Sequence, residues 1–356
     1  MGLAGEECPS RWDSLVSYRG FRFWGFGSAA LAIILVITLG GLVFSQSYMK
    51  ANKVFKGGAG TAEALKADVN PDLLKGEGSG RVNILLLGRG GGSHDAPDLT
   101  DTIMIASIDP VNKSTTLLSI PRDLWVNVPD AGVMKLNAAW QTGVYKSLGS
   151  RTTGTKDPKA IKAGFALVDK TIKDVTGVEI NYNVIVDFKA FEQAVDTVGG
   201  VSIDVPTDLV DPTMAWENAN NPILAKAGIN NFDGKHALIY SRSRETTSDF
   251  ARGQRQRQML VALKTKMVDL GTLSNPIKIS KLMSAFGDNV KTDLSMKNAA
   301  RLYKITKDIP DSKTTSLSLA DEGKSLVSTA NITGQSVVIP KSGLYKYVEI
   351  QQFLST

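Results

Sequence analysis

Cysteine and histidine are scarce in this chain of 356 residues, which contains one cysteine, Cys8, and two histidines, His94 and His236. One cysteine cannot form an intrachain disulfide framework or a cysteine-ligated metal site. Neither histidine lies in the sequence context of a nucleophile and its base, so no Ser-His-Asp or Cys-His arrangement can be assigned. The glycines at 90–92 lack the GK[ST] and GxGxxG spacings, which excludes both of these nucleotide-binding loops.

A large excess of one charge is also absent. The chain has 41 lysines and arginines against 35 acidic residues, which gives a net charge of +6. This modest basic balance favours anionic partners but does not choose among phospholipid headgroups, anionic glycans and nucleic acid. With 42% hydrophobic and 21% charged residues, the chain has the composition of one or two globular domains.

One long uncharged run covers residues 23–44 (FWGFGSAALAIILVITLGGLVF), and it is long enough to cross about 30 Å of hydrocarbon as a helix. It is longer than the apolar core of a cleaved signal peptide, and no small-residue cleavage site follows it. A retained membrane helix at 23–45 is therefore the better interpretation. Basic residues are nearly balanced on its two sides. Long domains are usually translocated across the membrane whatever the flanking charges. We therefore expect a cytoplasmic leader at 1–22 and an extracytoplasmic domain anchored in the cell membrane.

After the anchor, the composition indicates a linker, one domain and an extension. Residues 46–80 are rich in glycine, lysine, alanine and aspartate, as linkers are. Residues 81–290 alternate between strand and helix patterns, and residues 291–356 are expected to pack on the same domain. The expected strands are 81–88, 101–108, 114–120, 180–188 and 201–205, and the expected helices are 134–146, 158–176 and 188–197. This order predicts an α/β fold, an α+β mixed sheet flanked by helices.

The strands on either side of the turn at 109–113 predict an antiparallel hairpin, because that turn contains aspartate, proline and asparagine. In such a hairpin the start of the first strand pairs with the end of the second. Asp101 should therefore meet Arg122 and Asp123 at the open end. The polar loop 89–100 enters at the same end, so three polar segments are expected to converge.

The loop before the hairpin contains candidate metal ligands. Asp95, Asp98 and Asp101 lie within seven positions of one another, and carboxylate oxygens are the ligands that Mg²⁺ prefers. The alternative is a polar turn with ordinary capping aspartates. Lys135 and Asn137, at the start of an expected helix, are candidates for binding polar substrate atoms or for capping that helix.

Arginines crowd a later segment. Extended backbone at 241–244 would point Arg242 and Arg244 to one face, and the helix that follows places Arg252 and Gln256 one turn apart, with Arg255 between them. Guanidinium groups bind phosphate through two hydrogen bonds, and several together can neutralise a pyrophosphate. The segment therefore predicts an anion site. The alternative is a solvated basic patch with surface ion pairs.

Several ordered segments resemble the LytR-CpsA-Psr family of cell-wall ligases. They span about residues 81–270 and read VNILLLG, LTDTIMIASIDP, TTLLSIPRDLWV, KLNAAW, GKHALIYSRSR and DFARGQRQRQ. The resemblance implies a membrane-anchored domain that binds a polyprenyl-pyrophosphate-linked glycan, transfers its phosphoglycan to a peptidoglycan hydroxyl and releases polyprenyl phosphate. It also implies that Asp101 binds magnesium, that Arg122, Arg242, Arg244 and Arg252 are catalytic arginines on the pyrophosphate, and that Asp123 and Gln256 support them. Asp123 is in addition a candidate catalytic residue, either to accept the proton of the acceptor hydroxyl or to orient Arg122.

One position departs from the family pattern. Family members typically have a second aspartate shortly after the glycine that ends the first strand, in a Gly-x-Asp-x-Arg sequence. Here Gly88 is followed by arginine and three glycines. Asp95 and Asp98 are the candidates to replace that aspartate as a second metal ligand.

Two other functions fit parts of the pattern. Water in place of the glycan acceptor would make the protein a pyrophosphatase, and arginines used only for their charge would make it a non-catalytic, membrane-anchored binder of anionic glycans. Metal dependence separates these, because a pure binder should weaken with salt and ignore removal of Mg²⁺. Nucleic acid is disfavoured, because the basic segment has no interleaved aromatic residues and an extracytoplasmic location is expected.

Overall fold

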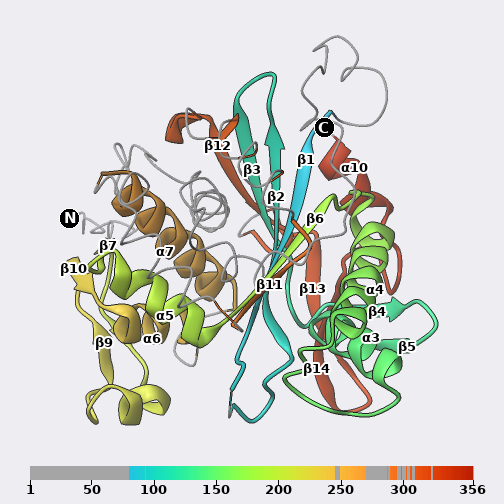
Figure 1. The fold of residues 1–356 in the computed structure, drawn as a ribbon, viewed down its shortest axis with the longest axis horizontal. Helices are drawn as coiled ribbons and strands as arrows, with labels where there is room; N and C mark the ends of the chain where they lie inside the picture. Colours follow the sequence, from blue (N-terminus) through green and yellow to red (C-terminus); the bar gives the residue numbers. More distant parts are fainter. Residues whose placement is uncertain are drawn as a thin grey trace, which may run out of the picture.

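Figure 1 shows the computed structural model of the chain, which describes residues 80–92, 94–244, 249–269, 289–294, 309–321 and 324–355, and residues 287, 298, 302, 305 and 306. The expected leader and membrane helix, and all of the expected linker except Gly80, lie outside the described residues. Among the described residues, no helix combines the length and apolar character needed to cross a membrane.

A six-stranded mixed sheet forms the centre of the molecule, in the order β11-β6-β1-β2-β3-β12 (Figure 1). Its strands are β1 (Val82–Arg89), β2 (Thr100–Asp109), β3 (Ser114–Ser119), β6 (Tyr182–Asp187), β11 (Val290–Thr292) and β12 (Thr314–Ser318). β2 pairs antiparallel with β1 and β3, while β6 pairs parallel with β1 and β12 parallel with β3. The predicted hairpin is therefore confirmed.

Helices cover both faces of the sheet, as predicted (Figure 1). Side chains alternate along β1, so that Leu86 packs in a core with α5 (Phe188–Thr197), α6 (Gly234–Arg242) and α7 (Asp249–Asp269). Leu87 packs in a second core on the other face, with α3 (Ala139–Leu148) and α4 (Pro158–Thr176). Burial on both faces explains why β1 is apolar along nearly its whole length.

Smaller elements surround the sheet. They are β4 (Trp125–Val128), β5 (Gly132–Lys135), η2 (Leu136–Ala138), β7 (Val201–Val205), β8 (Leu209–Val210), η3 (Pro212–Glu217), β9 (Ile223–Ala225), β10 (Gly228–Phe232), η5 (Asp311–Lys313), β13 (Val327–Ile332), β14 (Gln335–Pro340) and α10 (Val348–Ser355). β13 and β14 form an antiparallel hairpin, and the Val338 N–H donates to the backbone oxygen of Asp123 at 2.9 Å. This hairpin brings residues 327–340 close to the residues that follow β3.

Three helical predictions met different outcomes. The ranges of α4 and α5 are as expected, and Asp157 caps α4 by accepting from the N–H groups of Lys159 and Ala160. The helix expected from residue 134 is wrong at its start, because β5 pairs with β4 and a 3-10 turn precedes α3. The extended backbone expected at 241–244 is wrong for its first two residues, because α6 continues to Arg242, whereas Ser243 is extended.

Two acidic residues share one amide in the sheet region. The Asn183 Nδ2 donates to Asp169 Oδ2 at 2.9 Å and to Asp293 Oδ2 at 3.0 Å. Burial, aided by the charges of Asp293 and Glu179, raises the pKa of Asp169 to about 7, although the bond from Asn183 opposes the shift. Within the described residues, Asp169 Oδ1 is buried without a hydrogen-bond partner, which suits a protonated carboxyl.

We therefore expect Asp169→Asn to raise the melting temperature at about pH 8 and to change it little at about pH 4. The unfolded carboxyl has a pKa of about 3.9. Because the folded pKa is raised, the cost of ionising Asp169 is absent below that value, grows up to about pH 7 and is complete above it. Thermal unfolding at both pH values measures this. Asp174→Asn, at an exposed position of α4, is the control. A larger gain at low pH would contradict the assignment.

Candidate functional site

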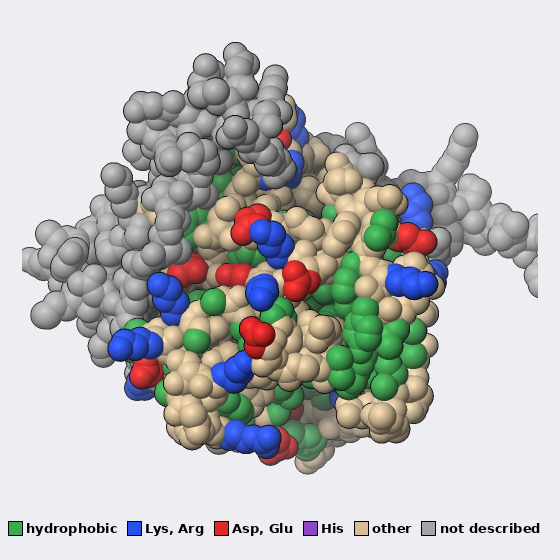
Figure 2. Space-filling view, turned by 90° about the vertical axis from the view of Figure 1, so that its right-hand side faces the viewer, with side chains coloured by type: hydrophobic (Ala, Val, Ile, Leu, Met, Phe, Trp, Pro, Cys, Tyr) green, Lys and Arg blue, Asp and Glu red, His purple; other side chains and the backbone are tan. Residues whose placement is uncertain are grey.

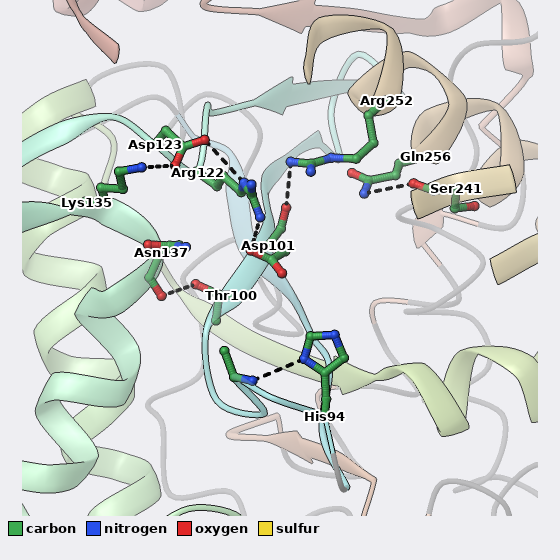
Figure 3. A network of polar contacts seen from close by, with 11 residues as sticks. His94, Thr100, Asp101, Arg122, Asp123, Lys135, Asn137, Ser241, Arg252 and Gln256 are labelled. Atoms are coloured by element: carbon green, nitrogen blue, oxygen red, sulfur yellow. Dashed lines mark hydrogen bonds and ion pairs between the residues drawn. The ribbon is translucent and has the colours of Figure 1, made fainter. Parts of the chain in front are cut away.

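The polar residues of the hairpin meet at one end of the sheet (Figure 3). Arg122 follows β3 and donates from Nη1 to Asp101 Oδ1 at 2.5 Å, at the start of β2. Its Nε donates to Asp123 Oδ2 at 3.3 Å, and the Lys135 Nζ lies 2.8 Å from Asp123 Oδ1. The convergence predicted from the turn is thus confirmed, and the guanidinium of Arg122 is held between two carboxylates.

The start of α7 supplies the other side of the site (Figure 3). Arg252 and Gln256 lie one helical turn apart, as predicted, and both approach the hairpin. The Arg252 Nη2 lies 3.5 Å from the backbone oxygen of Asp101, and the Gln256 Nε2 donates to the backbone oxygen of Ser241 at 3.4 Å. Gln256 therefore ties α7 to the end of α6, next to Arg242.

Arg242 is held from two sides although it ends its helix. Its Nη1 lies 2.7 Å from Glu217 Oε2, and its guanidinium lies 4.8 Å from the centroid of the Phe188 ring. Phe188 is fixed because Asp187, the last residue of β6, caps α5 by accepting from the Ala190 N–H at 3.0 Å. Arg244 is exposed, and its backbone N–H donates to an Asp211 carboxylate oxygen at 3.3 Å.

These side chains line an open cleft of about 670 Å³. The lining contains the carboxylates of Asp101 and Asp123, the cations of Arg122, Lys135, Arg242, Arg244 and Arg252, and the polar groups of Asn137, Gln256 and His94. Cations outnumber carboxylates, so the cleft favours an anion. By contrast, the basic and acidic side chains of the described residues are interspersed on the face shown in Figure 2.

Asp123 is ionised in this setting. Burial alone would raise the pKa of its carboxyl, but the hydrogen bond from Lys135 and the charge of Arg122 outweigh burial and hold the pKa below its usual range. A carboxylate with a lowered pKa is a weak base. Its geometry instead suits it to orient Arg122 and Lys135 toward the cleft.

A second, apolar hollow of about 100 Å³ adjoins the cleft. It lies between the sheet and α5, α6 and α7, and its walls include Leu86, Met104, Val184, Phe191, Leu238 and Leu260. Thr102, Phe188, Arg242 and Gln256 line both the hollow and the cleft. An apolar hollow whose mouth carries an arginine suits a molecule with an apolar tail and an anionic head.

Comparison with known proteins identifies this architecture. The LytR_cpsA_psr family model matches residues 43–346. The chain belongs to the LytR-CpsA-Psr family. The polyisoprenyl-teichoic acid–peptidoglycan teichoic acid transferase TagT of Bacillus subtilis (strain 168) is 27% identical over 301 residues, which cover 80% of this chain and 82% of TagT.

A second relative of this LytR-CpsA-Psr protein is the polyisoprenyl-teichoic acid–peptidoglycan teichoic acid transferase TagU of Oceanobacillus iheyensis (strain DSM 14371), which is 29% identical over 289 residues. That match covers 77% of this chain and 78% of TagU. Among solved structures, the LytR-CPS2A-psr family protein YwtF (TagT) with bound octaprenyl pyrophosphate lipid has a TM-score of 0.54 at 23% identity, covering 83% of this chain and 95% of that one. The structural likeness shows a shared fold.

Two expected metal ligands of this LytR-CpsA-Psr chain do not join Asp101. The Asp98 side chain is 1% exposed, forms an ion pair with Arg89 and accepts from the Gly154 N–H at 3.0 Å. Asp95 is exposed and is not among the residues that line the cleft. The described residues contain no group of three or more histidine, cysteine or acidic side chains placed to hold a metal. The expectation that Asp98 binds metal is corrected, because both its oxygens serve the fold.

Arg255 also differs from its expected role in substrate binding. Its buried guanidinium donates to the backbone oxygen of Tyr240 at 3.0 Å and to that of Ser243, and it lines neither the cleft nor the apolar hollow. It lies between Arg252 and Gln256 in sequence but on a different side of α7. Arg255 therefore fixes the end of α6, which carries Arg242.

His94 lines the cleft, which its sequence context did not indicate. Its ring packs edge-on against Phe188 with centroids 5.5 Å apart, and its Nδ1 accepts from the Ala96 N–H at 3.3 Å (Figure 3). A Cβ on Gly90 would lie 2.7 Å from the Cγ of His94. The His94 ring therefore occupies the space that a side chain at position 90 would need.

Proposed function

We propose that this protein is a transferase that moves a phosphoglycan from a polyprenyl-pyrophosphate carrier to a peptidoglycan hydroxyl. The observation that carries the proposal is the junction of the apolar hollow with the arginine-lined cleft, which share Arg242 and Gln256. The hollow suits the start of the lipid tail, and the cleft suits the pyrophosphate and its glycan. The names of TagT and TagU, and the octaprenyl pyrophosphate bound by YwtF, support the same substrate class.

The positions of the arginines suggest which phosphate of the pyrophosphate each one binds. Arg242, at the mouth of the hollow, would bind the lipid-linked phosphate, and Arg122 and Arg252 would bind the phosphate that carries the glycan. Phosphoryl transfer is accelerated mainly by positioning and by stabilising charge that develops on the transferred group and on the leaving oxygen. Asp101 and Asp123 hold Arg122 in place, so this charge stabilisation is organised before the substrate binds. Arg244 and Lys135 extend the same electropositive lining.

Magnesium is the proposed cofactor, and Asp101 is the residue that would hold it. Mg²⁺ sites commonly use one or two carboxylates together with substrate phosphates and water. Asp101 lines the cleft with one carboxylate oxygen bound to Arg122, whereas both oxygens of Asp123 have basic partners. When bound, the ion would neutralise charge on the pyrophosphate oxygens. Anchoring by residues 23–45, with the domain outside the cell membrane, would hold the cleft near its lipid-linked donor.

The proposal is tested by incubating the full-length protein in detergent with a polyprenyl-pyrophosphate-linked saccharide and peptidoglycan glycan strands. We expect Mg²⁺-dependent release of polyprenyl phosphate together with a saccharide–peptidoglycan product, and we expect Asp101→Asn to lower release by about 100-fold. Asp95→Asn is the matched control, because Asp95 is an exposed carboxylate outside the cleft lining.

Other outcomes identify the alternatives. Release without a peptidoglycan product would favour a pyrophosphatase. Binding of the lipid-linked saccharide that weakens with salt, with no release and no response to Mg²⁺, would favour a non-catalytic binder. Either result would contradict the transferase.

A further inference from the structure

A third hollow, of about 280 Å³, adjoins the cleft on the side of the C-terminal segments; we name it the extension pocket. Its far wall contains Ser318 at the end of β12, Ser325, and Thr329 on β13. Its near wall contains Arg122 and Arg252, which also line the cleft. The extension pocket and the cleft therefore meet at the two arginines that would hold the transferred phosphate.

The three spaces share Thr102 and Gln256 in their walls, but they differ in the arginines that line them. Arg242 lines the apolar hollow and the cleft but not the extension pocket. Arg122 and Arg252 line the cleft and the extension pocket but not the apolar hollow. A pyrophosphate whose lipid end enters the apolar hollow would thus present its second phosphate, which carries the glycan, at the near wall of the extension pocket.

In phosphoryl transfer the attacking and leaving oxygens lie roughly in line through the phosphorus. The leaving oxygen belongs to the lipid-linked phosphate, so it departs toward the apolar hollow. The attacking hydroxyl must then approach from the opposite side, and the extension pocket, which Arg122 and Arg252 line and Arg242 does not, is the adjoining space suited to hold it. This requirement distinguishes the extension pocket from the wider cleft. The cleft would accommodate the donor glycan, to the side of the line through the attacking oxygen, the phosphorus and the leaving oxygen.

The far wall offers hydrogen bonds suited to sugar hydroxyls. Ser325 donates to the backbone oxygen of Val327 at 2.7 Å and accepts from the Val327 N–H at 3.3 Å, and Ser318 accepts from the Ala320 N–H at 3.1 Å. A hydroxyl oxygen has two lone pairs, so each of the two serines can still accept one more bond. The exposed Thr329 hydroxyl makes no hydrogen bond with any described residue. A set of neutral hydroxyls, with no charge of its own, suits a saccharide better than a second anion.

We propose that the extension pocket binds the acceptor saccharide and presents its hydroxyl to the transferred phosphate. This inference rests on the proposed function. The hydroxyl oxygen forms a bond to the phosphorus, the bond from phosphorus to the bridging oxygen breaks, and polyprenyl phosphate leaves with that electron pair. The hydroxyl proton passes to solvent. The C-terminal residues would therefore determine which acceptor is used.

Thr329→Trp tests the assignment because it fills the extension pocket. Thr329 pairs with Val338, and both line the pocket. Transfer product and total polyprenyl phosphate are measured with full-length protein and peptidoglycan glycan strands. We expect the ratio of transfer product to polyprenyl phosphate to fall by about tenfold or more, with a raised KM for the strands. Ser336→Trp, on β14 of the same hairpin but lining none of the three spaces, should leave the ratio unchanged.

An unchanged ratio in Thr329→Trp would overturn the proposal, and so would a raised KM for the lipid-linked donor with an unchanged KM for the strands.

A direct binding experiment separates this proposal from the proposed function. Peptidoglycan-derived oligosaccharides are titrated into the protein without donor. Binding that is lost in Thr329→Trp but kept in Ser336→Trp supports the acceptor pocket even if no polyprenyl phosphate is ever released. Equal binding by both variants, or none by the parent protein, counts against it.

Discussion

Replacing Arg122 with alanine is expected to lower the rate of polyprenyl phosphate release by about 10²–10³-fold. Arg122 lines both the cleft and the extension pocket, and its guanidinium is bound by Asp101 and Asp123 together. The variant loses a cation positioned for the transferred phosphate. It also leaves two carboxylates facing an anionic substrate without the charge between them, and this repulsion adds to the loss. Steady-state release at saturating donor, with folding checked by circular dichroism, measures the effect.

Two further variants make the Arg122 prediction specific. Arg122→Lys should retain part of the activity, because lysine keeps the charge but not the fork that binds Asp101, Asp123 and phosphate together. Arg151→Ala removes an arginine at an exposed position after α3 and should leave the rate unchanged. Parental release by Arg122→Ala would remove this arginine from the chemistry and leave its ion pairs with a purely structural role.

The sequence predicted the centre of the site because local rules determine it. A turn at 109–113 sets the register of the β2–β3 hairpin, and that register alone brings Asp101 to Arg122 and Asp123. Helical spacing likewise brings Arg252 and Gln256 to one side of α7. These contacts need no knowledge of distant parts of the chain.

Other features depend on contacts between distant segments, and the sequence did not reveal them. Arg242 was expected in extended backbone, yet the Asp233 cap begins a helix that reaches it, and Glu217 and Phe188 fix its guanidinium. Arg255 has the same charge as Arg252 and lies only three residues after it in the sequence. It is nevertheless committed to the α6 backbone, because its position on the helix directs it there.

The sequence did not predict the far wall of the extension pocket for a related reason. Residues 314–340 lie about 200 positions after the hairpin, and their serines and threonines carry no motif. The parallel pairing of β12 with β3, and the bond from the Val338 N–H to Asp123, bring them to the site. Such pairings are set by packing of the whole sheet, for which a single sequence gives little signal.

Asp98 illustrates how the missing family aspartate misdirected the sequence interpretation. A carboxylate three residues before Asp101 was a candidate for the second ligand, but Arg89 at the end of β1 pairs with it in the interior. The two side chains are 6% and 1% exposed, and the Arg89 guanidinium also lies 5.6 Å from the centroid of the Trp140 ring. The pair therefore joins β1, the polar loop and α3.

Removing one member of this pair should be severe for stability. We expect Asp98→Ala to lower the free energy of unfolding by about 3–5 kcal/mol, because it leaves the Arg89 charge buried without its ion-pair partner. The Gly154 N–H also loses its acceptor. Denaturant unfolding of the variant against the parent protein measures the loss. A difference below about 1 kcal/mol would contradict a structural role for the pair.

The double variant Arg89→Met/Asp98→Leu separates the cost of an unpaired charge from the cost of losing the pair. Replacing both members with apolar residues of similar size is expected to recover most of the stability, since a buried pair often contributes little beyond a well-packed apolar contact. If Asp98 instead served the metal, the double variant would lose the Mg²⁺ dependence of polyprenyl phosphate release. We expect that dependence to persist, because Asp101 and not Asp98 lines the cleft. The double variant should therefore be stable enough to assay and still depend on Mg²⁺, so it tests the metal role of Asp98 without the loss of stability that a single substitution would cause.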